Sequence, residues 1–284
     1  MGASCVEWGM RTQTYPSDVT DAQWALLQPH LPVSPGGGRP CKTDLRDVVD
    51  AIFYLLRTGC QWRYLPKDFP PKSTVWRYFD QWRNHGTLDR IHDLLRTKVR
   101  TLEKPYAPRT TASVDSQSVD TTTGGEQRGR DNAKNVDGRK RHIVVDSMGL
   151  LLAVLVTAAD VDDGKAAQEL FARLEGQPMS RVGRMFADSK YHNLALYEWV
   201  QEEARWELVI VSRPAGSVGW VKLPLRWTVE RTFAWLGKCR RLSKDRERSV
   251  CSSEAMVKLA MIHLMLNRLQ PKNTDAEFHY RQAG

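Results

Sequence analysis

The segment Leu225–Lys238 reads LRWTVERTFAWLGK and carries a single acidic side chain, that of Glu230. At 3.6 residues per turn an apolar stripe should face a core, and Glu230 lies in the column beside it. That column leaves room for a large anionic group and suits a metal held against a nucleic-acid backbone. A solvated, salt-bridged helix face is the commoner explanation of an isolated Arg-x-x-x-Glu pair. The rest of the column holds only arginines and small residues: Arg226, Ala234, Gly237 and Arg241.

The composition favours a polyanionic partner. The chain has 284 residues and a formal net charge of +9, and its ten tryptophans and 41% hydrophobic content argue against a disordered basic tail protein. Its length allows two domains, each with its own core. Five cysteines without a CxxC pair indicate neither a zinc module nor a full disulfide framework and are typical of a reducing cytosol. Without a signal peptide or a membrane-length apolar run, we expect a soluble protein with no membrane partner.

Residues 15–104 predict an all-α domain. Thr20 and Gln23 form a capping box that opens a short helix. Thr43 is expected to cap a strongly amphipathic helix that Gly59 closes. Between them, SPGGGRP at Ser34–Pro40 reads as a flexible break or, less often, as an arm for a minor groove.

A third predicted helix supplies the candidate DNA-reading face of this domain. Ser73 is expected to cap it, and its apolar residues point inward while Arg77 and Gln81 point outward. Such side chains suit phosphates and base edges. With a fourth helix that ends before residue 105, the pattern is that of a helix-turn-helix-type module. A helical bundle that serves only as a scaffold remains an alternative.

From residue 111 the apolar period changes to that of strands. TASVDSQSV, RKRHIVVDS and LLLAVLVTAA follow one another, and the turn Ser147–Gly149 should join the last two as an antiparallel hairpin. A helix from Asp163, the strand RVGRMFADSKYH, a helix at Asn193–Glu203 and the strand WELVIVS complete a mixed five-stranded sheet flanked by helices, over residues 111–250. The other segments are a flexible tail (1–14), a linker (105–110), a C-terminal helix packed on the sheet (251–270) and a second tail (271–284).

Three carboxylates stand out by their position in these elements. Asp115 lies within the first predicted strand, Asp188 at the end of the fourth, and Glu230 on the last helix of the α/β region. A charge within a buried strand costs free energy unless something compensates it. Mg²⁺ or Mn²⁺ would do so, because hard cations prefer carboxylate oxygens and leave positions for water and phosphate. If the first and fourth strands are neighbours, two ions could serve an in-line phosphoryl transfer there.

These motifs resemble the DDE transposases of bacterial insertion sequences, specifically the IS5 group within the wider IS4-like superfamily. The resemblance rests on DSQSV at Asp115, ADSKY at Asp188 and RWTVERTFAWL around Glu230, and it covers about residues 15–270. It implies an RNase H-like catalytic domain preceded by a helical DNA-binding domain. It also implies that the three carboxylates are catalytic and bind two Mg²⁺ or Mn²⁺ ions, and Arg226 matches the arginine four residues before the glutamate.

The chain departs from the superfamily pattern at two places. Leu223 and Gly237 stand where a tyrosine and a lysine are found, and Lys238 and Arg241 are the nearest cations that could contact the transposon end. Helical geometry favours Arg241. The spacing of 42 residues from Asp188 to Glu230 leaves no room for a large inserted domain, so hairpin-forming machinery is not expected.

Further charged residues have less specific explanations. Two basic segments, Arg128–Arg141 and Lys238–Arg248, are candidate DNA contacts, with Arg141 in the first, although a solvated face explains each equally well. His142 and His192 are expected to be sheet-end or phosphate contacts rather than general bases, because metals supply the activated oxygen in this chemistry. Strand ends and helix caps account for four other aspartates: Asp146, Asp160, Asp162 and Asp163.

The resemblance thus implies a bacterial, cytoplasmic transposase that associates with the nucleoid when bound to DNA. It would bind the terminal inverted repeats of its element, nick the element ends and join the 3′-hydroxyls to target DNA. Because two ends must be held together, we expect a homodimer or a larger assembly on DNA. A structure-selective nuclease on the same fold and a catalytically silent DNA-binding regulator are the alternatives.

Overall fold

The computed structural model describes residues 14–32, 43–103, 110–122, 124–174, 182–204, 206–211, 216 and 226–272. The predicted break at Ser34–Pro40, Leu223 and most of the predicted linker and tails lie outside these residues. The predicted division into domains therefore remains a prediction. Within the described residues, no helix combines the length and the apolar character needed to cross a membrane.

The N-terminal part of the chain is helical, as the sequence predicts. It consists of α1 (Asp21–Leu27), α2 (Leu45–Thr58), α3 (Lys72–Asn84) and α4 (Thr87–Glu103), with short 3-10 turns η1 (Gln28–His30) and η2 (Trp62–Tyr64). The inward-facing residues of α3 are buried, whereas Arg77 and Gln81 are exposed. The predicted orientation of this helix is therefore confirmed.

The helix ends confirm two of the four predicted signals. Thr20 and Gln23 form the reciprocal capping box, and Gly59 ends α2 in the left-handed region with a φ of 71°. The predictions that Thr43 caps α2 and that Ser73 caps α3 were wrong. Asp44 caps α2 by accepting from the amide of Arg46, and α3 starts after Pro71 without a side-chain cap. A carboxylate caps a helix as well as a hydroxyl does, and the cap of α2 therefore lies one residue after the predicted Thr43.

The glycine that ends α2 also allows close packing. A Cβ at Gly59 would lie 3.0 Å from the backbone carbonyl carbon of Arg240. Arg240 belongs to η5 (Arg240–Leu242), a 3-10 turn close to the C-terminal helix. A larger residue at position 59 would push this turn away from α2.

The α/β part is a mixed sheet with the strand order β2-β3-β1-β5-β6, and β4 also pairs with β3. Its strands are β1 (Thr110–Asp120), β2 (Gly129–Asp131), β3 (Val136–Asp146), β4 (Leu151–Ala158), β5 (Val182–Ala187) and β6 (Glu207–Ile210). β3 runs antiparallel to β1 and β4, while β1, β5 and β6 are parallel neighbours. These are the order and directions of an RNase H-like sheet.

Within the described residues the sheet has six strands, where the sequence predicts five. The five predicted strands and the β3–β4 hairpin are confirmed, with Gly149 at a φ of 79° in the turn. The extra strand, β2, has only three residues, Gly-Arg-Asp, and pairs with the start of β3, next to the part that pairs with β4. So short a polar segment has no apolar alternation, so its pairing could not be predicted from the sequence.

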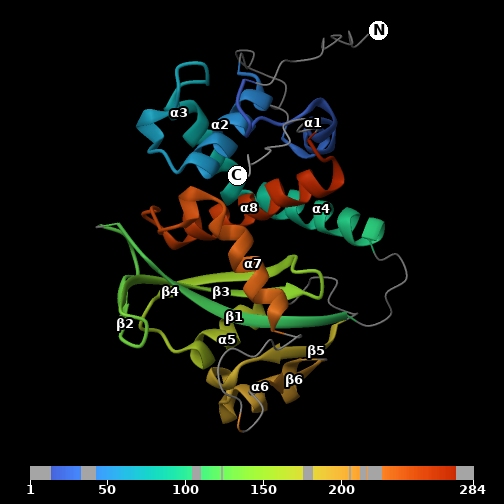
Figure 1. The fold of residues 1–284 in the computed structure, drawn as a ribbon, viewed down its shortest axis with the longest axis vertical. Coiled ribbons are helices and arrows are strands. Elements are labelled where there is room, and N and C mark those ends of the chain that lie inside the picture. The colour runs from blue at the N-terminus through green and yellow to red at the C-terminus, as the bar shows by residue number, and fades with distance from the viewer. Residues whose placement is uncertain are drawn as a thin grey trace, which may run out of the picture.

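Helices cover both faces of the sheet (Figure 1). α5 (Asp163–Ala172) and α6 (Leu194–Glu203) lie on one face, and α7 (Trp227–Gly237) and α8 (Val250–Leu269) lie on the other. A 3-10 turn, η4 (Ser189–Tyr191), follows β5. α8 lies between the N-terminal helices and the sheet and contacts α4, α2 and β4.

Two clusters of buried apolar side chains hold these layers together. One contains Ala112 and Val114 of β1 with residues of β5, α5 and α6. The other joins the N-terminal helices, α7 and α8 to the opposite face of the sheet, including Ile143 and Val154. Burying each large side chain contributes about 1.5–3 kcal/mol, so this second cluster is a substantial link between the helical region and the sheet.

Candidate active site

The first carboxylate, Asp115, lies in the middle of β1, opposite Ile143 of β3. Its neighbours Ala112 and Val114 point into the cluster below the sheet, next to α5 and α6. Because side chains alternate along a strand, Asp115 and Ile143 point to the other face, on which α7 packs. The alternation of the sequence therefore puts this charge on the α7 face.

The second carboxylate, Asp188, comes directly after β5, which is the parallel neighbour of β1. The condition set for a shared site, that the first and fourth predicted strands are neighbours, is therefore met. Asp188 Oδ1 accepts a hydrogen bond of 3.0 Å from the amide of Lys190, so the carboxylate also caps η4. This bond holds the side chain at the end of the strand.

Arg226, at the N-terminal end of α7, brings the two carboxylates together. Its Nη2 lies 3.3 Å from Asp115 Oδ2 and 3.5 Å from Asp188 Oδ2. All three side chains are partly buried, with 17–19% of their surface exposed. Arg226 was predicted to position phosphates, and here its guanidinium is paired with the carboxylates.

The negative charge of Asp115 and Asp188 exceeds the positive charge that Arg226 places beside them. Burial raises the pKa of Asp115, the negative charge of Asp188 raises it further, and the amide of Ser116 and the guanidinium of Arg226 only partly offset this. Among the described residues, one guanidinium thus serves two carboxylates. The oxygens of Asp115 and Asp188 that face Arg226 are hard donors converging on one cationic position, and this donor set fits a divalent ion such as Mg²⁺ or Mn²⁺.

Glu230 is exposed and lies one helical turn beyond Arg226 on α7. In the described part of the chain, no three His, Cys, Asp or Glu side chains are grouped closely enough to hold a metal ion. The structure therefore pairs Asp115 with Asp188 and leaves Glu230 outside this pair, on a helix that begins at the same place.

Two predicted DNA contacts lie inside the protein. α7 ends at Gly237, so Arg241 does not continue the Glu230 column as predicted. It is 4% exposed in η5, with Nε 2.7 Å from Glu247 Oε1. Arg141 is 1% exposed on β3 and donates to the carbonyl of Leu242. Both arginines tie segments of the fold together, and neither side chain is available to DNA in this structure. Lys238, Arg77 and Gln81 are exposed.

The sequence did not predict a charged cluster on the opposite face, around Asp163. This buried carboxylate has three nitrogens near it: Lys140 Nζ at 3.2 Å, His142 Nδ1 at 3.6 Å and Lys190 Nζ at 3.8 Å. Asp162 is the cap of α5, so the prediction of a cap holds for Asp162 but not for Asp163. The signal in the sequence was the alternation of Lys140 and His142 with Arg139 and Arg141 along β3.

Two buried rings border this cluster. His142 is fully buried, with Nε2 3.0 Å from Thr157 Oγ1, so the predicted phosphate contact is wrong for this histidine. Burial lowers the pKa of His142 to about 4. Burial also raises the pKa of Tyr191 well above its usual range, and Asp115, Asp163 and Asp188 add to this effect. The negative charges of both groups therefore act on Tyr191.

Comparison with known proteins identifies both parts of the chain. Residues 19–92 match the family described as "Putative transposase of IS4/5 family", and residues 106–265 match the "Transposase DDE domain". From Burkholderia cepacia, the "Insertion element IS402 uncharacterized 16.2 kDa protein" is 32% identical over 119 residues, covering 39% of this chain and 79% of that protein. The "Putative transposase for insertion sequence element IS402" is 31% identical over 139 residues, covering 47% of this chain and 65% of that protein.

Solved structures are similar only at a low level. A piggyBac transposase synaptic complex with hairpin DNA has a TM-score of 0.40 and 12% identity, covering 88% of this chain and 71% of that one. A pre-cleavage Mos1 transpososome has a TM-score of 0.29 and 11% identity, covering 84% and 80%. Scores this low carry no weight beside the family matches. With the transposase DDE domain matched over residues 106–265, more than half of its length, the chain belongs to the DDE transposases.

Proposed function

We propose that this protein is a DNA transposase that binds the terminal inverted repeats of an insertion sequence, cleaves at the ends and transfers the strands to target DNA. The observation that carries the proposal is the convergence of Asp115 and Asp188 on one cationic position, held by Arg226. Family membership supports the class of reaction. The +9 net charge supports a polyanionic substrate.

Asp115 and Asp188 would hold two divalent ions, Mg²⁺ or Mn²⁺, with Glu230 completing the second position from α7. When bound, such ions supply an activated oxygen nucleophile and stabilise the leaving oxygen of an in-line displacement. The raised pKa of Asp115 supports this assignment, because a pair of carboxylates with one guanidinium gains from added positive charge.

The side chains of the protein have separate tasks around the phosphate. The Asp188 carboxylate is oriented by its bond to the Lys190 amide, and that of Asp115 by its bond to the Ser116 amide at 2.7 Å. Arg226 can move from the carboxylates to a phosphate oxygen, since it lies at the start of a helix and donates from a planar fork. Lys238, exposed at the other end of α7, would contact the DNA backbone.

In the N-terminal helices, the exposed face of α3 with Arg77 and Gln81 is the proposed reader of the inverted repeat. A homodimer or larger assembly would hold two ends together, in the bacterial cytoplasm at the nucleoid. A light-scattering mass of one chain per DNA end under active conditions would contradict this assembly.

The test is Mg²⁺-dependent cleavage and strand transfer on a labelled duplex that carries the element's end. Wild type is compared with Asp115→Ala and Glu230→Gln, and Asp120→Asn is the matched control. Asp120 lies on the same strand, with its Oδ2 3.4 Å from Lys244 Nζ and about half of its side chain exposed. We expect joined products from wild type and control, none from the two variants, and unchanged binding in all four.

The other outcomes separate the alternatives. Cleavage without joined products in wild type would indicate a structure-selective nuclease. Binding without any cleavage would indicate a silent DNA-binding regulator. Cleavage that persists in Asp115→Ala would show that the active site lies elsewhere.

A further inference from the structure

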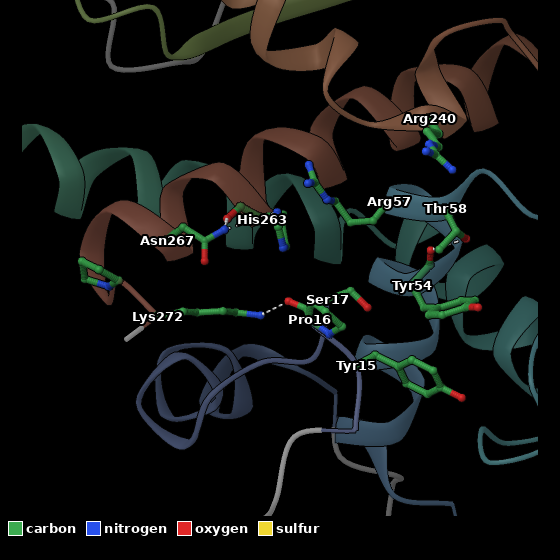
Figure 2. Close-up of a pocket in the computed structure, with 11 residues that line it drawn as sticks. Tyr15, Pro16, Ser17, Tyr54, Arg57, Thr58, Arg240, His263, Asn267 and Lys272 are labelled. Atoms are coloured by element: carbon green, nitrogen blue, oxygen red, sulfur yellow. Dashed lines mark hydrogen bonds between the residues drawn. The ribbon is translucent and has the colours of Figure 1, made fainter. Parts of the chain in front are cut away.

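A second polar site lies on the far side of α8 from the sheet, among the N-terminal helices. It is a cavity of about 530 Å³ between α2, α8, η5 and the segments just before α1 and after α8 (Figure 2). Its volume is in the range of small-ligand sites. None of the residues assigned to the carboxylate site lines it.

The cavity is positively charged. Arg57, Arg240 and Lys272 line it, and among its described lining residues none is Asp or Glu. Lys272 donates to the backbone carbonyls of Pro16, at 2.6 Å, and Asp18, and the negative charges of Asp18 and Asp50 partly offset the burial that lowers its pKa. Near the lining, the carboxylate of Asp18 accepts from the backbone amides of Thr14 and Tyr15, and that of Asp50 accepts from the amide of Val19. The cavity therefore favours an anion.

Two buried polar atoms in the lining, Ser17 Oγ and His263 Nε2, have no hydrogen-bond partner among the residues that the structure describes. The amide of Asn267 lies 3.4 Å from His263 Nδ1, which places the ring hydrogen on Nε2. Burial and the charges of Arg57 and Lys272 lower the pKa of His263 to about 4, so the ring is neutral. Leaving Ser17 Oγ and His263 Nε2 unpaired costs free energy, so an anion that accepts hydrogen bonds from both would be stabilised in this cavity.

The cavity is linked to the carboxylate site by α7. This helix begins after Arg226 and ends three residues before Arg240. Arg57 Nη1 donates at 3.1 Å to the carbonyl of Lys238, so Lys238 lies beside the cavity. The 11 residues of α7 span about 16 Å, the length of about five base pairs at 3.4 Å each. A duplex that runs along α7 from the carboxylates would extend over about five base pairs to the end of this helix, beside the cavity.

We propose that this cavity binds a phosphodiester group of the DNA backbone, about five base pairs from the cleaved position. Arg57, Arg240 and Lys272 supply the charge, and Ser17 and His263 donate to the phosphate oxygens. The site anchors the duplex without reading its sequence. This inference rests on the proposed function, because it requires that the chain binds DNA.

The test compares Arg240→Gln with wild type in equilibrium binding of an end duplex across a range of salt concentrations. Arg184→Gln is the matched control: Arg184 is exposed on β5 and pairs with Glu207 at 3.1 Å. Loss of one phosphate contact should weaken binding about fivefold at about 0.15 M salt and reduce the slope of log K against log salt by about 1. The same change is expected for an unrelated duplex, while Arg240→Lys restores most of the affinity.

Thermal unfolding checks that Arg240→Gln is folded, and inorganic phosphate is tested in parallel as a stabilising ligand. Equal DNA binding by wild type and Arg240→Gln would overturn the inference and leave the proposed function intact. Absence of DNA binding in wild type would overturn both. Stabilisation by phosphate that Arg240→Gln loses, with DNA binding unchanged, would also overturn it and assign the cavity to a free anion.

Discussion

The two faces of the sheet carry charged groups of opposite balance. On the α7 face, two carboxylates, Asp115 and Asp188, share the guanidinium of Arg226. On the α5 face, one carboxylate, Asp163, has Lys140, Lys190 and His142 around it. The first group needs another cation, whereas the second is neutralised by the protein itself. This difference separates a site that can take an ion from solution from one that stabilises the fold.

The largest expected effect of this difference is on catalysis. Asp188→Asn should reduce strand cleavage roughly 10³-fold, because it removes half of the paired negative charge that holds the ions. Asp163→Asn should change the rate per folded molecule by less than about tenfold. Single-turnover cleavage of a labelled end duplex at saturating protein measures both. Equal losses in the two variants would show that both faces belong to the active site.

The second expected effect is on the free energy of unfolding. Here the variant on the α5 face should have the larger effect and the variant on the α7 face the smaller. Asp163→Asn leaves the buried ammonium of Lys140 without its carboxylate and should lower the free energy of unfolding by about 3 kcal/mol. Asp188→Asn should lower it little. Urea unfolding monitored by tryptophan fluorescence checks this. Adding Lys140→Met to Asp163→Asn should recover part of the loss, and no recovery would contradict the pairing.

The buried histidine of the α5 face predicts a pH dependence. The folded-state pKa of His142 is about 4, below its usual 6.5, so the neutral ring stabilises the fold above pH 6.5. This contribution, about 3 kcal/mol, is lost as the pH falls from 6.5 through 4. His142→Gln should flatten the fall of the melting temperature in this window. His85→Gln, which changes an exposed histidine, is the control and should follow wild type.

The smallest effect concerns the guanidinium on the α7 face. If Arg226 occupies the position of a cation, Arg226→Gln should strengthen binding of Mn²⁺ about tenfold, because the ion no longer competes with the arginine. Calorimetric titration of the protein without DNA measures the affinity. Arg184→Gln should leave it unchanged. Weaker Mn²⁺ binding in Arg226→Gln would show that the arginine supports the ion instead.

Much of the fold could be predicted because its signals are local. The alternation in β1, β3 and β4, the turn at Gly149 and the capping box at Thr20 each depend on neighbours a few residues apart. The wrong predictions concern contacts between distant segments. β2 depends on pairing with β3, and the end of α7 at Gly237 turns Arg241 inward to Glu247.

The sequence by itself determined the helices and every described strand except β2, the identity of Asp115, Asp188 and Glu230 as candidates, and the family that their motifs resemble. Only the tertiary structure decided that Arg226 bridges two of these carboxylates, that Arg141 and Arg241 are buried, and that Asp163 has its own cations. It also brought Arg57, Arg240 and Lys272 around one cavity. The physical reason is that periodicity reports which face a side chain takes, whereas the balance of charge at a site depends on which faces meet.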